Sequence, residues 1–550
     1  MNKVIKHLFL QSIFTFPMLV ASAQTESEVS GEVQDAEVVI EKERKIELPQ
    51  ETKVYEFIKW SPEVEQAEGI PAEYRWFDYP MRTVLVDSIS ANVVSEESLI
   101  DYQNFGRAGI GNYGSPLFDL SLTNAFDANT IVGANVKHKS FSKGEVDEEN
   151  SASASSEVSI WGALMNDQFS INSALGYQSE RSYYYGYPEG TIVSNSEIKH
   201  SSNFVNFDIQ LDDSFLKDDW GYYANTGFRH YSDNFEASEN TLLIQGGLDY
   251  LEKFFLDTDM AFSSYSDIGI DVTRSFVRLN PYYRIVLSDL TLDVGLSASL
   301  QNDDVPDLAG SRFLPYLNAK YQLNDSYYAF AKLDGGFTFN SLYETAKDIN
   351  MLNQSTVIVN SDRLIDLSAG IAGRPIDQLS FKLTTGYKVV NYLPVLINNV
   401  TDQSRIDVFY ASENTDILWA EGEALYKINE AHEFAVRLGA YNYSSSSFDQ
   451  IYHRPTTSIS LSGSHDVFPK FNASWYFSYL GGLKADGRLT TDADISLDPI
   501  TQLELRLHYQ LKEQWGAFLS GENLFGQQFE RYLYYTQRGV QIKGGITFKF

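Results

Sequence analysis

The sequence predicts an all-β protein: a large closed antiparallel transmembrane β-barrel of about 22 strands, with a short N-terminal periplasmic segment. Three observations predict this fold. No apolar run after residue 23 reaches the length that a spanning helix needs, two-faced segments of about ten residues recur, and short connections alternate with long ones. Strands cross lipid only as a closed barrel, because lipid cannot satisfy the hydrogen bonds of a free sheet edge.

The composition excludes some classes of protein. There are 74 acidic and 42 basic side chains, and the net charge is −32. Such a chain repels phosphates, so nucleic acid is not an expected partner. Cysteine is absent, which rules out disulfides and leaves burial and hydrogen-bond closure to provide stability.

The first 23 residues have the pattern of a cleaved signal peptide. Lys3 and Lys6 supply positive charge, residues 8–20 are mostly apolar, and the small residues Ala21 and Ala23 frame a cleavage site. A membrane-anchoring helix is the alternative, but the apolar stretch is too short for one. We therefore expect export, and an outer-membrane location in a Gram-negative bacterium.

The final segment shows the two-faced pattern most clearly. Apolar residues and glycine occupy one face and mainly polar residues the other, because successive side chains of a strand point to opposite sides. The first face holds Val540, Ile542, Gly544, Ile546, Phe548 and Phe550, and the second Gln541, Lys543, Gly545, Thr547 and Lys549. Similar alternation occurs in residues 118–123, 290–300, 365–371 and 379–383.

The lengths of the connections favour a membrane barrel over a soluble sandwich. Tight periplasmic turns and long external loops must alternate in a transmembrane barrel. The short connections are expected at 127–129, 166–168, 252–253, 288–289, 324–325, 377–378, 429–430, 469–470 and 513–514. Long polar ones are expected at 140–152, 180–201, 303–312, 338–362, 391–404 and 484–495.

The strand count is even, which places both chain ends of the barrel in the periplasm. Strands are expected to start near Arg107, Ser115, Thr130, Ser156, Phe169, Ser201, Trp220, Thr241, Phe254, Arg274, Leu290, Arg312, Ser326, Asp362, Leu379, Asp416, Glu433, Arg454, Phe471, Leu497, Trp515 and Val540.

Three parts follow from this pattern after the signal peptide. Residues 24–54 are acidic and polar and are expected to form a flexible tail. Residues 55–104 carry aromatic side chains such as Trp60 and Trp76, enough to dock inside the lumen or on a periplasmic partner, and the sequence does not choose between these. Residues 105–550 form the barrel.

Aromatic residues are abundant, with 35 Phe, 35 Tyr and 7 Trp. They gather where strands meet connections, at 183–185, at 327–328, and at Tyr532, Tyr534 and Tyr535. We expect these rings to form the aromatic girdles of a membrane barrel. A stacking site for sugars or flat ligands is the alternative.

Residues 511–550 resemble the end of a TonB-dependent receptor barrel. Asn523, Leu524 and Phe525 match the core of a motif in that family, and the chain ends in an aromatic strand. The resemblance implies a 22-stranded outer-membrane transport protein. It also implies that the terminal residues Ile546, Phe548 and Phe550 form the signal read by the barrel-assembly machinery.

The N-terminal part departs from that family. The receptors carry a globular plug that is larger than residues 24–104, so no full plug is expected. Residues 37–41 resemble the short box that engages an energising partner by strand addition, although a chance apolar quartet in a flexible tail is the favoured interpretation. A periplasmic or outer-membrane protein partner could bind residues 24–104.

No motif predicts an enzyme, a cofactor or a metal. The eight histidines lack ligand spacing, although His230, His453 and His465 are expected near the outer rim, where a triad is conceivable. Acidic clusters occur in two predicted loops, and solvated, self-repelling loops are favoured over a Ca²⁺ site. These clusters are Glu145, Asp147, Glu148 and Glu149, and Asp303, Asp304 and Asp307.

The polar faces of the strands predict which charged residues line the lumen. They are Asp119, Asp293, Asp366, Lys382, Lys543 and Lys549. A wide lumen without contents would breach the membrane barrier. We therefore expect it to be occluded by residues 55–104, by inward-folded loops such as 338–362, or by another protein.

Three functions remain open. The first is transport, or binding of a solute, by a TonB-dependent receptor-like barrel without a full plug. The second is a non-enzymatic subunit that acts as a scaffold in a larger outer-membrane assembly. The third is a passive porin.

Overall fold

The computed structural model describes residues 104–550, with gaps at 128, 167–168, 189, 214–218, 268–269, 354–355, 430 and 488–493. The predicted signal peptide, the acidic tail, the box at 37–41 and the 55–104 segment up to residue 103 lie outside the described residues.

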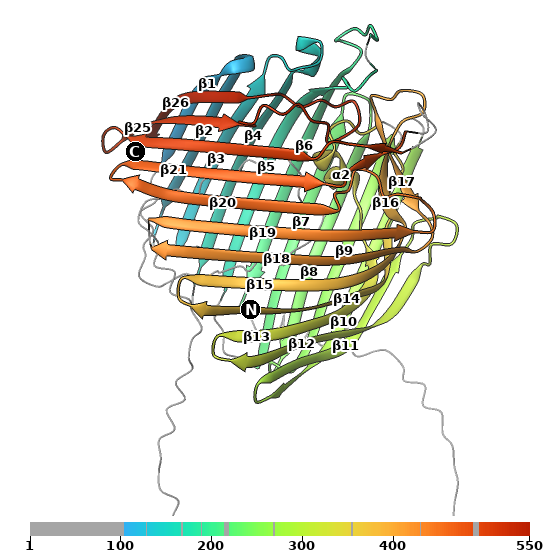
Figure 1. Cartoon of the computed structure of the whole chain (residues 1–550). Helices are drawn as coiled ribbons and strands as arrows, with labels where there is room; N and C mark the ends of the chain where they lie inside the picture. The colour runs from blue at the N-terminus through green and yellow to red at the C-terminus, as the bar shows by residue number, and fades with distance from the viewer. Residues whose placement is uncertain are drawn as a thin grey trace, which may run out of the picture. The chain divides into compact units, whose positions relative to one another are not determined.

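The main sheet of the described residues has 22 antiparallel strands (Figure 1). Its first eleven strands are β1 (Phe105–Gly111), β2 (Ser115–Ala125), β3 (Thr130–Phe141), β4 (Ser153–Met165), β5 (Ser170–Tyr183), β6 (Lys199–Asp212), β7 (Trp220–Asp233), β8 (Ser238–Tyr250), β9 (Phe254–Asp267), β10 (Ile270–Leu287) and β11 (Leu290–Gln301). The others are β12 (Ser311–Asn324), β13 (Tyr327–Thr338), β14 (Ser361–Ile376), β15 (Leu379–Asn391), β18 (Thr415–Asn429), β19 (His432–Ser445), β20 (Thr457–Phe468), β21 (Phe471–Gly481), β24 (Ile500–Gln510), β25 (Trp515–Glu522) and β26 (Gln541–Lys549).

The sheet closes because its first and last strands pair. β1 and β26 run antiparallel, from Phe105 opposite Lys549 to Gly111 opposite Lys543. Beyond them, the backbones of Asn104 and Phe550 exchange two hydrogen bonds of 3.0 Å. Neither strand is left as a free edge, which is the condition for a sheet in lipid.

The smaller elements lie in the long connections. They are the hairpin of β16 (Leu393–Asn398) and β17 (Ile406–Ala411), the short pair β22 (Lys484–Ala485) and β23 (Ile495–Ser496), the 3₁₀ turns η1 (Asn112–Gly114) and η2 (Glu148–Ser151), and α2 (Leu342–Asp348). The Ser341 side chain caps α2 by accepting the N–H of Glu344 at 3.2 Å. Within the described residues, no helix has the length and apolar character needed to cross a bilayer.

The long connections lie at one end of the strands, together with the short connections that follow β1, β7 and β9, and the connections at the other end are short turns. We call these two ends the tight-turn end, which includes Phe550, and the long-loop end, which includes α2, β16 and β17 (Figure 1). The predicted alternation is confirmed, and all 22 predicted strands are present. Their starts deviate by up to four residues: Arg454 was expected to begin a strand but lies in the loop before β20, and β10 begins four residues before Arg274.

The two faces of the wall differ as predicted. On β26, Ile546 points outward and is 52% exposed, whereas Lys543 points inward and is 3% exposed. The register and the alternation of side chains also place the other predicted lumen residues on the inner face. They are Asp119, Asp293, Asp366, Lys382 and Lys549.

Aromatic rings form a belt outside the wall at the tight-turn end. Cross-strand partners pack with ring centroids 4.5–4.9 Å apart, and these pairs are Trp220 with Tyr250, Phe254 with Tyr283, and Trp515 with Phe548. Such rings suit the boundary between lipid tails and water. These outward-facing rings lie where we predicted one of the two aromatic girdles.

Candidate functional site

The inner wall is lined with ion pairs between neighbouring strands. Arg107 pairs with Asp119, and the guanidinium of Arg284 lies 2.7 Å from the carboxylate of Asp293. Further pairs join Lys137 and Glu157, Arg229 and Asp208, Arg278 and Asp334, Lys388 and Asp366, and Lys543 and Glu522. Partly exposed pairs add little stability. Their main consequence is a polar lumen wall in which positive and negative charges are close together.

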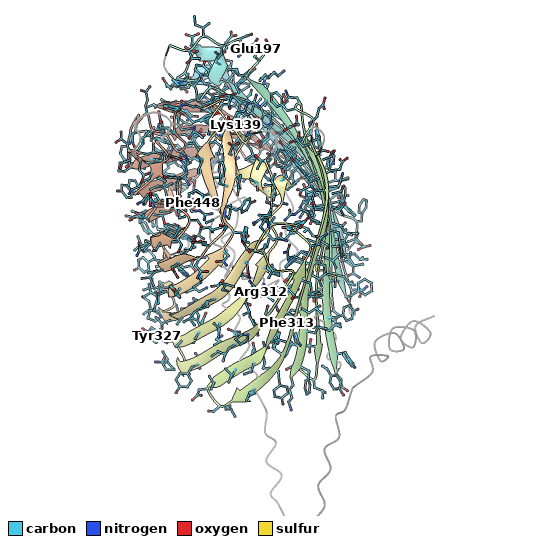
Figure 2. All side chains as sticks on the ribbon, turned by 90° about the vertical axis from the view of Figure 1, so that its right-hand side faces the viewer. Lys139, Glu197, Arg312, Phe313, Tyr327 and Phe448 are labelled. Carbon is cyan, nitrogen blue, oxygen red and sulfur yellow. The ribbon has the colours of Figure 1, made fainter. Side chains whose placement is uncertain are left out.

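The long loops pack together at the other end of the lumen, and we call them the loop cap. It comprises the described residues of 142–152, 184–198, 302–310, 339–360, 392–414, 446–456, 482–499 and 523–540 (Figure 2). One buried cluster unites Ala152, Tyr184, Met351, Ile406 and Tyr535. The loops after β3 and β13 both contribute, and these strands are the third and thirteenth of 22. The loops therefore meet across the mouth of the barrel.

Hydrogen bonds connect loops that are distant in sequence. The hydroxyl of Tyr184 donates to the carbonyl of Leu352 at 2.9 Å, and the hydroxyl of Tyr535 donates to the carbonyl of Ser404. These rings belong to groups predicted to form lipid-facing girdles, and for Tyr184 and Tyr535 that prediction is wrong. Their hydroxyls reach loop carbonyls, so the rings are buried inside the cap instead of facing lipid.

The loop at 339–360 turns inward and packs on the wall. Leu342 and Tyr343 of α2 join a buried cluster with Phe204, Tyr231 and Tyr265 of β6, β7 and β9. Of the three occluding groups considered from sequence, the inward-folded loop is therefore present in the described part of the chain. Sequence reasoning gave no sign of which wall strands it contacts.

A buried carboxylate anchors this loop. Glu239 of β8 is 1% exposed and accepts hydrogen bonds from the N–H of Tyr343 and the hydroxyl of Ser263, both at 2.8 Å. The negative charge lies beside the first turn of α2, where the helix dipole favours an anion. Glu239 was not singled out from the sequence, because its partner is 104 positions away.

A buried arginine anchors the same loop from the other side. Arg274 contacts Asp303 through two nitrogens, at 2.8 and 3.0 Å, and also donates to the carbonyl of Asn340 at 2.6 Å and the side chain of Asn360 at 2.7 Å. The prediction that Asp303 is solvated is wrong, because Arg274 on the neighbouring strand β10 pairs with it and both side chains are buried. Asp304 and Asp307 are exposed, as expected.

The acidic cluster of residues 145–149 also contains one half-buried carboxylate and three exposed ones. Glu145 accepts hydrogen bonds from the hydroxyl of Tyr113 at 2.5 Å and the N–H of Gly539 at 3.0 Å. The Tyr113 hydrogen bond is the main cause that lowers the pKa of Glu145, and the Gly539 bond adds to it. Asp147, Glu148 and Glu149 are exposed. Among the described residues, no group of three or more His, Asp or Glu is arranged to hold a metal.

The three histidines expected at the outer rim lie in different places. His453 is buried in the loop cap, and burial, with the nearby Arg531 charge, lowers its pKa to about 3. His230 is in β7, where it contacts Asn240 at 2.9 Å. His465 was expected at this rim, but it lies near the tight-turn end, with Nδ1 3.4 Å from Nδ1 of His432. A catalytic triad was considered conceivable at this rim. The structure does not bring these three histidines together in one site.

The family-like motif begins the loop after β25. Asn523 is buried with φ of 49°, and its side-chain amide donates to the carbonyls of Gln527 at 2.8 Å and Arg538 at 2.9 Å, so it joins the two ends of this loop. The N–H of Leu524 donates to the carbonyl of Leu503 at 2.9 Å, and Phe525 is exposed. The motif therefore shapes the base of one cap loop.

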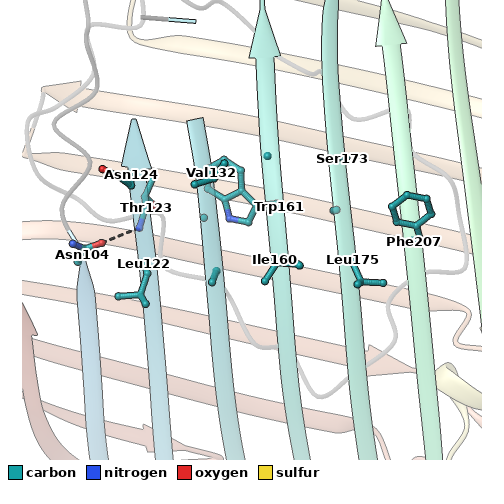
Figure 3. A pocket seen from close by; sticks show the side chains of 14 residues that line it. Asn104, Leu122, Thr123, Asn124, Val132, Ile160, Trp161, Ser173, Leu175 and Phe207 are labelled. Carbon is teal, nitrogen blue, oxygen red and sulfur yellow. Dashed lines mark hydrogen bonds between the residues drawn. The ribbon is translucent and has the colours of Figure 1, made fainter. Parts of the chain in front are cut away.

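A depression of about 790 Å³ marks the wall at β2–β6 (Figure 3). Leu122, Ile160, Leu175 and Phe207 surround it on the outward face, and small residues such as Ala134 leave the space between them. This lining is largely apolar and offers no group suited to catalysis. We regard it as part of the lipid-facing surface.

Comparison with solved structures supports the fold. The siderophore receptor PirA from Acinetobacter baumannii aligns with a TM-score of 0.61 and 10% identity, over 82% of this chain and 80% of that one. The FrpB iron transporter from Neisseria meningitidis aligns with a TM-score of 0.62 and 11% identity, over 82% of each chain. The chain therefore shares the fold of these proteins, a closed 22-stranded antiparallel β-barrel.

A third structure extends the same comparison. The pyoverdine receptor FpvA from Pseudomonas aeruginosa, bound to pyoverdine, matches the receptor-like barrel with a TM-score of 0.59 and 13% identity, over 82% of this chain and 78% of that one. No family model matches the chain, and no curated protein matches it. At these identities, the likeness is one of fold.

Proposed function

We propose that this receptor-like barrel is an outer-membrane transport protein that binds a solute at its loop cap and moves it through the lumen. The tight-turn end, with both barrel termini, would face the periplasm, and the loop cap would face the outside. Two features support the proposal: the fold of the neighbours, which are receptors and transporters, and the polar inner wall behind the cap.

One observation carries the proposal. The cluster of Tyr184, Met351, Ile406 and Tyr535 joins loops from nearly opposite sides of the mouth. A passive porin needs a mouth that stays open to water, whereas a receptor can keep its mouth covered until a solute binds. The packed cap therefore favours gated transport over the porin alternative.

The neighbours suggest a first class of solute to test. They include siderophore receptors and an iron transporter. We propose iron chelates as the first candidates. As predicted from sequence, we expect no enzymatic activity.

The proposal also includes protein partners. Ile546, Phe548 and Phe550 on the closing strand would be read by the barrel-assembly machinery during insertion. Residues 24–104 would contact a periplasmic or outer-membrane partner. A stoichiometric partner recovered by pull-down, without any loss of solute uptake on deletion of the chain, would favour the scaffold alternative.

Conductance in planar bilayers tests the gate. We expect the full-length chain to show little steady conductance, and a variant in which residues 342–358 are replaced by a short linker to conduct. A large steady conductance of the unaltered protein would contradict the proposal and favour a porin. Growth on ferric chelates as sole iron source, with and without the chain, tests the solute class separately.

A further inference from the structure

Two arginines of the loop cap differ from those of the lumen wall. Arg107, Arg278 and Arg284 each contact a carboxylate. Arg454, before β20, and Arg531, between β25 and β26, contact no carboxylate within the part of the chain that the structure describes. In a chain with 74 acidic residues, two such arginines in one packed region are unexpected.

Both guanidiniums are held in place by backbone carbonyls. Arg454 donates through Nη2 to the carbonyl of Pro394 at 3.1 Å, and Arg531 donates through Nη1 to the carbonyl of His453 at 2.6 Å. Both side chains are half-buried, so they are positioned but reachable. A guanidinium has five N–H donors, so each retains several for a further acceptor.

His453 provides a second, independent observation. Its side chain is 1% exposed, and neither ring nitrogen has a hydrogen-bond partner among the described residues. Its backbone adopts a φ of 57°, which a non-glycine residue rarely does. The ring lies 5.3 Å from that of Tyr532, the neighbour of Arg531. A buried polar ring without a partner costs free energy unless a ligand or water satisfies it.

The electrostatics of this region favour a negative ligand. Burial lowers the pKa of Arg454, and the nearby charge of Arg531 lowers it further. Two acidic groups of this region already accept hydrogen bonds from tyrosines. Glu421 accepts the hydroxyl of Tyr441 at 2.8 Å, and Asp494 accepts that of Tyr452 at 2.9 Å.

We propose that Arg454, Arg531 and His453 form an oxyanion site, which binds a carboxylate or phosphate group of a soluble anionic solute. Planar guanidiniums pair with such groups through two parallel hydrogen bonds, and a partly desolvated setting strengthens these bonds. The inference rests on the proposed function for its role in uptake, since it names the class of solute that the loop cap recognises. Binding itself does not depend on transport.

Calorimetric titration of the full-length protein in detergent tests binding, with citrate as the carboxylate probe and inorganic phosphate as the other. Arg454→Gln and Arg531→Gln should each weaken binding by at least about tenfold, because each removes charge-assisted hydrogen bonds. Arg437→Gln is the matched control, because Arg437 is 78% exposed on β19 and lies 3.8 Å from Glu423, away from the site. It should bind like the unaltered protein.

The outcomes separate the possibilities. Binding of citrate alone assigns a carboxylate solute, and binding of phosphate alone assigns a phosphate-bearing one. No binding of either anion, or equal binding by both glutamine variants and the unaltered protein, overturns the site. Arg531→Lys is a second variant that keeps the positive charge at this position. It should bind the anion more weakly than the unaltered protein but more strongly than Arg531→Gln. Equal loss of binding in the two variants, with both folded, would contradict this role of Arg531. If the protein binds the anion but supports no uptake, the transport proposal is contradicted and the oxyanion site is still supported.

Discussion

Single buried side chains determine how firmly the loop cap is held. Glu239 joins β8 to α2 by accepting the N–H of Tyr343, and Arg274 joins β10 to the other side of the same loop. An unsatisfied buried partner costs more than the hydrogen bond contributes, because water cannot reach it. Substitution of these residues should therefore loosen the cap without opening the barrel wall.

Glu239→Ala should make the cap open more often. It leaves the N–H of Tyr343 and the hydroxyl of Ser263 without their acceptor, at a cost of roughly 1–3 kcal/mol. Tryptic cleavage after Lys347, an exposed residue within α2, reports the opening and should accelerate about 5- to 150-fold. The control Glu413→Ala, at an exposed cap position, should leave the rate unchanged. Equal rates in Glu239→Ala and the unaltered protein would refute this anchor.

His453 should make the protein less stable in acid. Burial lowers its folded pKa to about 3, from an ordinary value of 6.5, so the unfolded chain binds a proton more readily between these values. This contribution to stability is complete above the ordinary value and is lost progressively as the pH falls toward 3. The unaltered protein should therefore lose more thermal stability between about pH 7 and about pH 5 than His453→Gln does. Identical losses, measured as unfolding midpoints in detergent, would show that His453 does not titrate in this way.

At the scale of elements, the seam between β1 and β26 depends on a close approach of two backbones. Gly109 lies opposite Gly545 on the inner face, with the ring of Phe518 beside them. A Cβ atom on Gly545 would lie 2.1 Å from the carbonyl oxygen of Ala108. Backbone cannot move aside as a flexible side chain can, so this position requires glycine.

Gly545→Val should prevent efficient closure of the barrel. The overlap with Ala108 costs at least about 1–3 kcal/mol, and it falls on the last pairing that the sheet makes. The yield of the folded, heat-modifiable form on a gel measures closure and should fall several-fold. The neighbouring Gly544→Ala should fold normally, since its Cβ would meet nothing nearer than 3.6 Å. Normal yield for Gly545→Val would mean that the seam tolerates separation.

The strands could be predicted from sequence because lipid and water impose opposite demands on alternate residues. Each outward position of β26 needs an apolar side chain or glycine and most inward positions need a polar one, so the period of two is visible without the structure. The loops have no such period. Arg274 and Asp303 are 29 residues apart, and Glu239 and Tyr343 are 104 apart. The pairing of β10 with β11 joins the first two, and the inward fold of the 339–360 loop joins the second two, and neither has a periodic signal, so the contacts within the cap could not be foreseen.

At the scale of the whole molecule, the account depends on the closed wall. The cap can cover the mouth only if the 22 strands form a ring. The ion-paired side chains of the inner face are stable only if the closed wall shields them from lipid. The barrel fold, the proposed gate and the proposed oxyanion site all presuppose this ring. A test of closure therefore tests the central claim.

Disulfide formation across the seam measures closure most directly, because the chain has no cysteine of its own. Ala108 lies opposite Ile546 on β26, and Ile546 lies opposite Ala517 on β25. Cysteines at 108 and 546 should cross-link within one chain after membrane insertion. Cysteines at 108 and 517, two strand spacings or about 9–10 Å apart, should not. Failure of the first pair to link within one chain, or linkage of the second alone, would contradict a closed barrel.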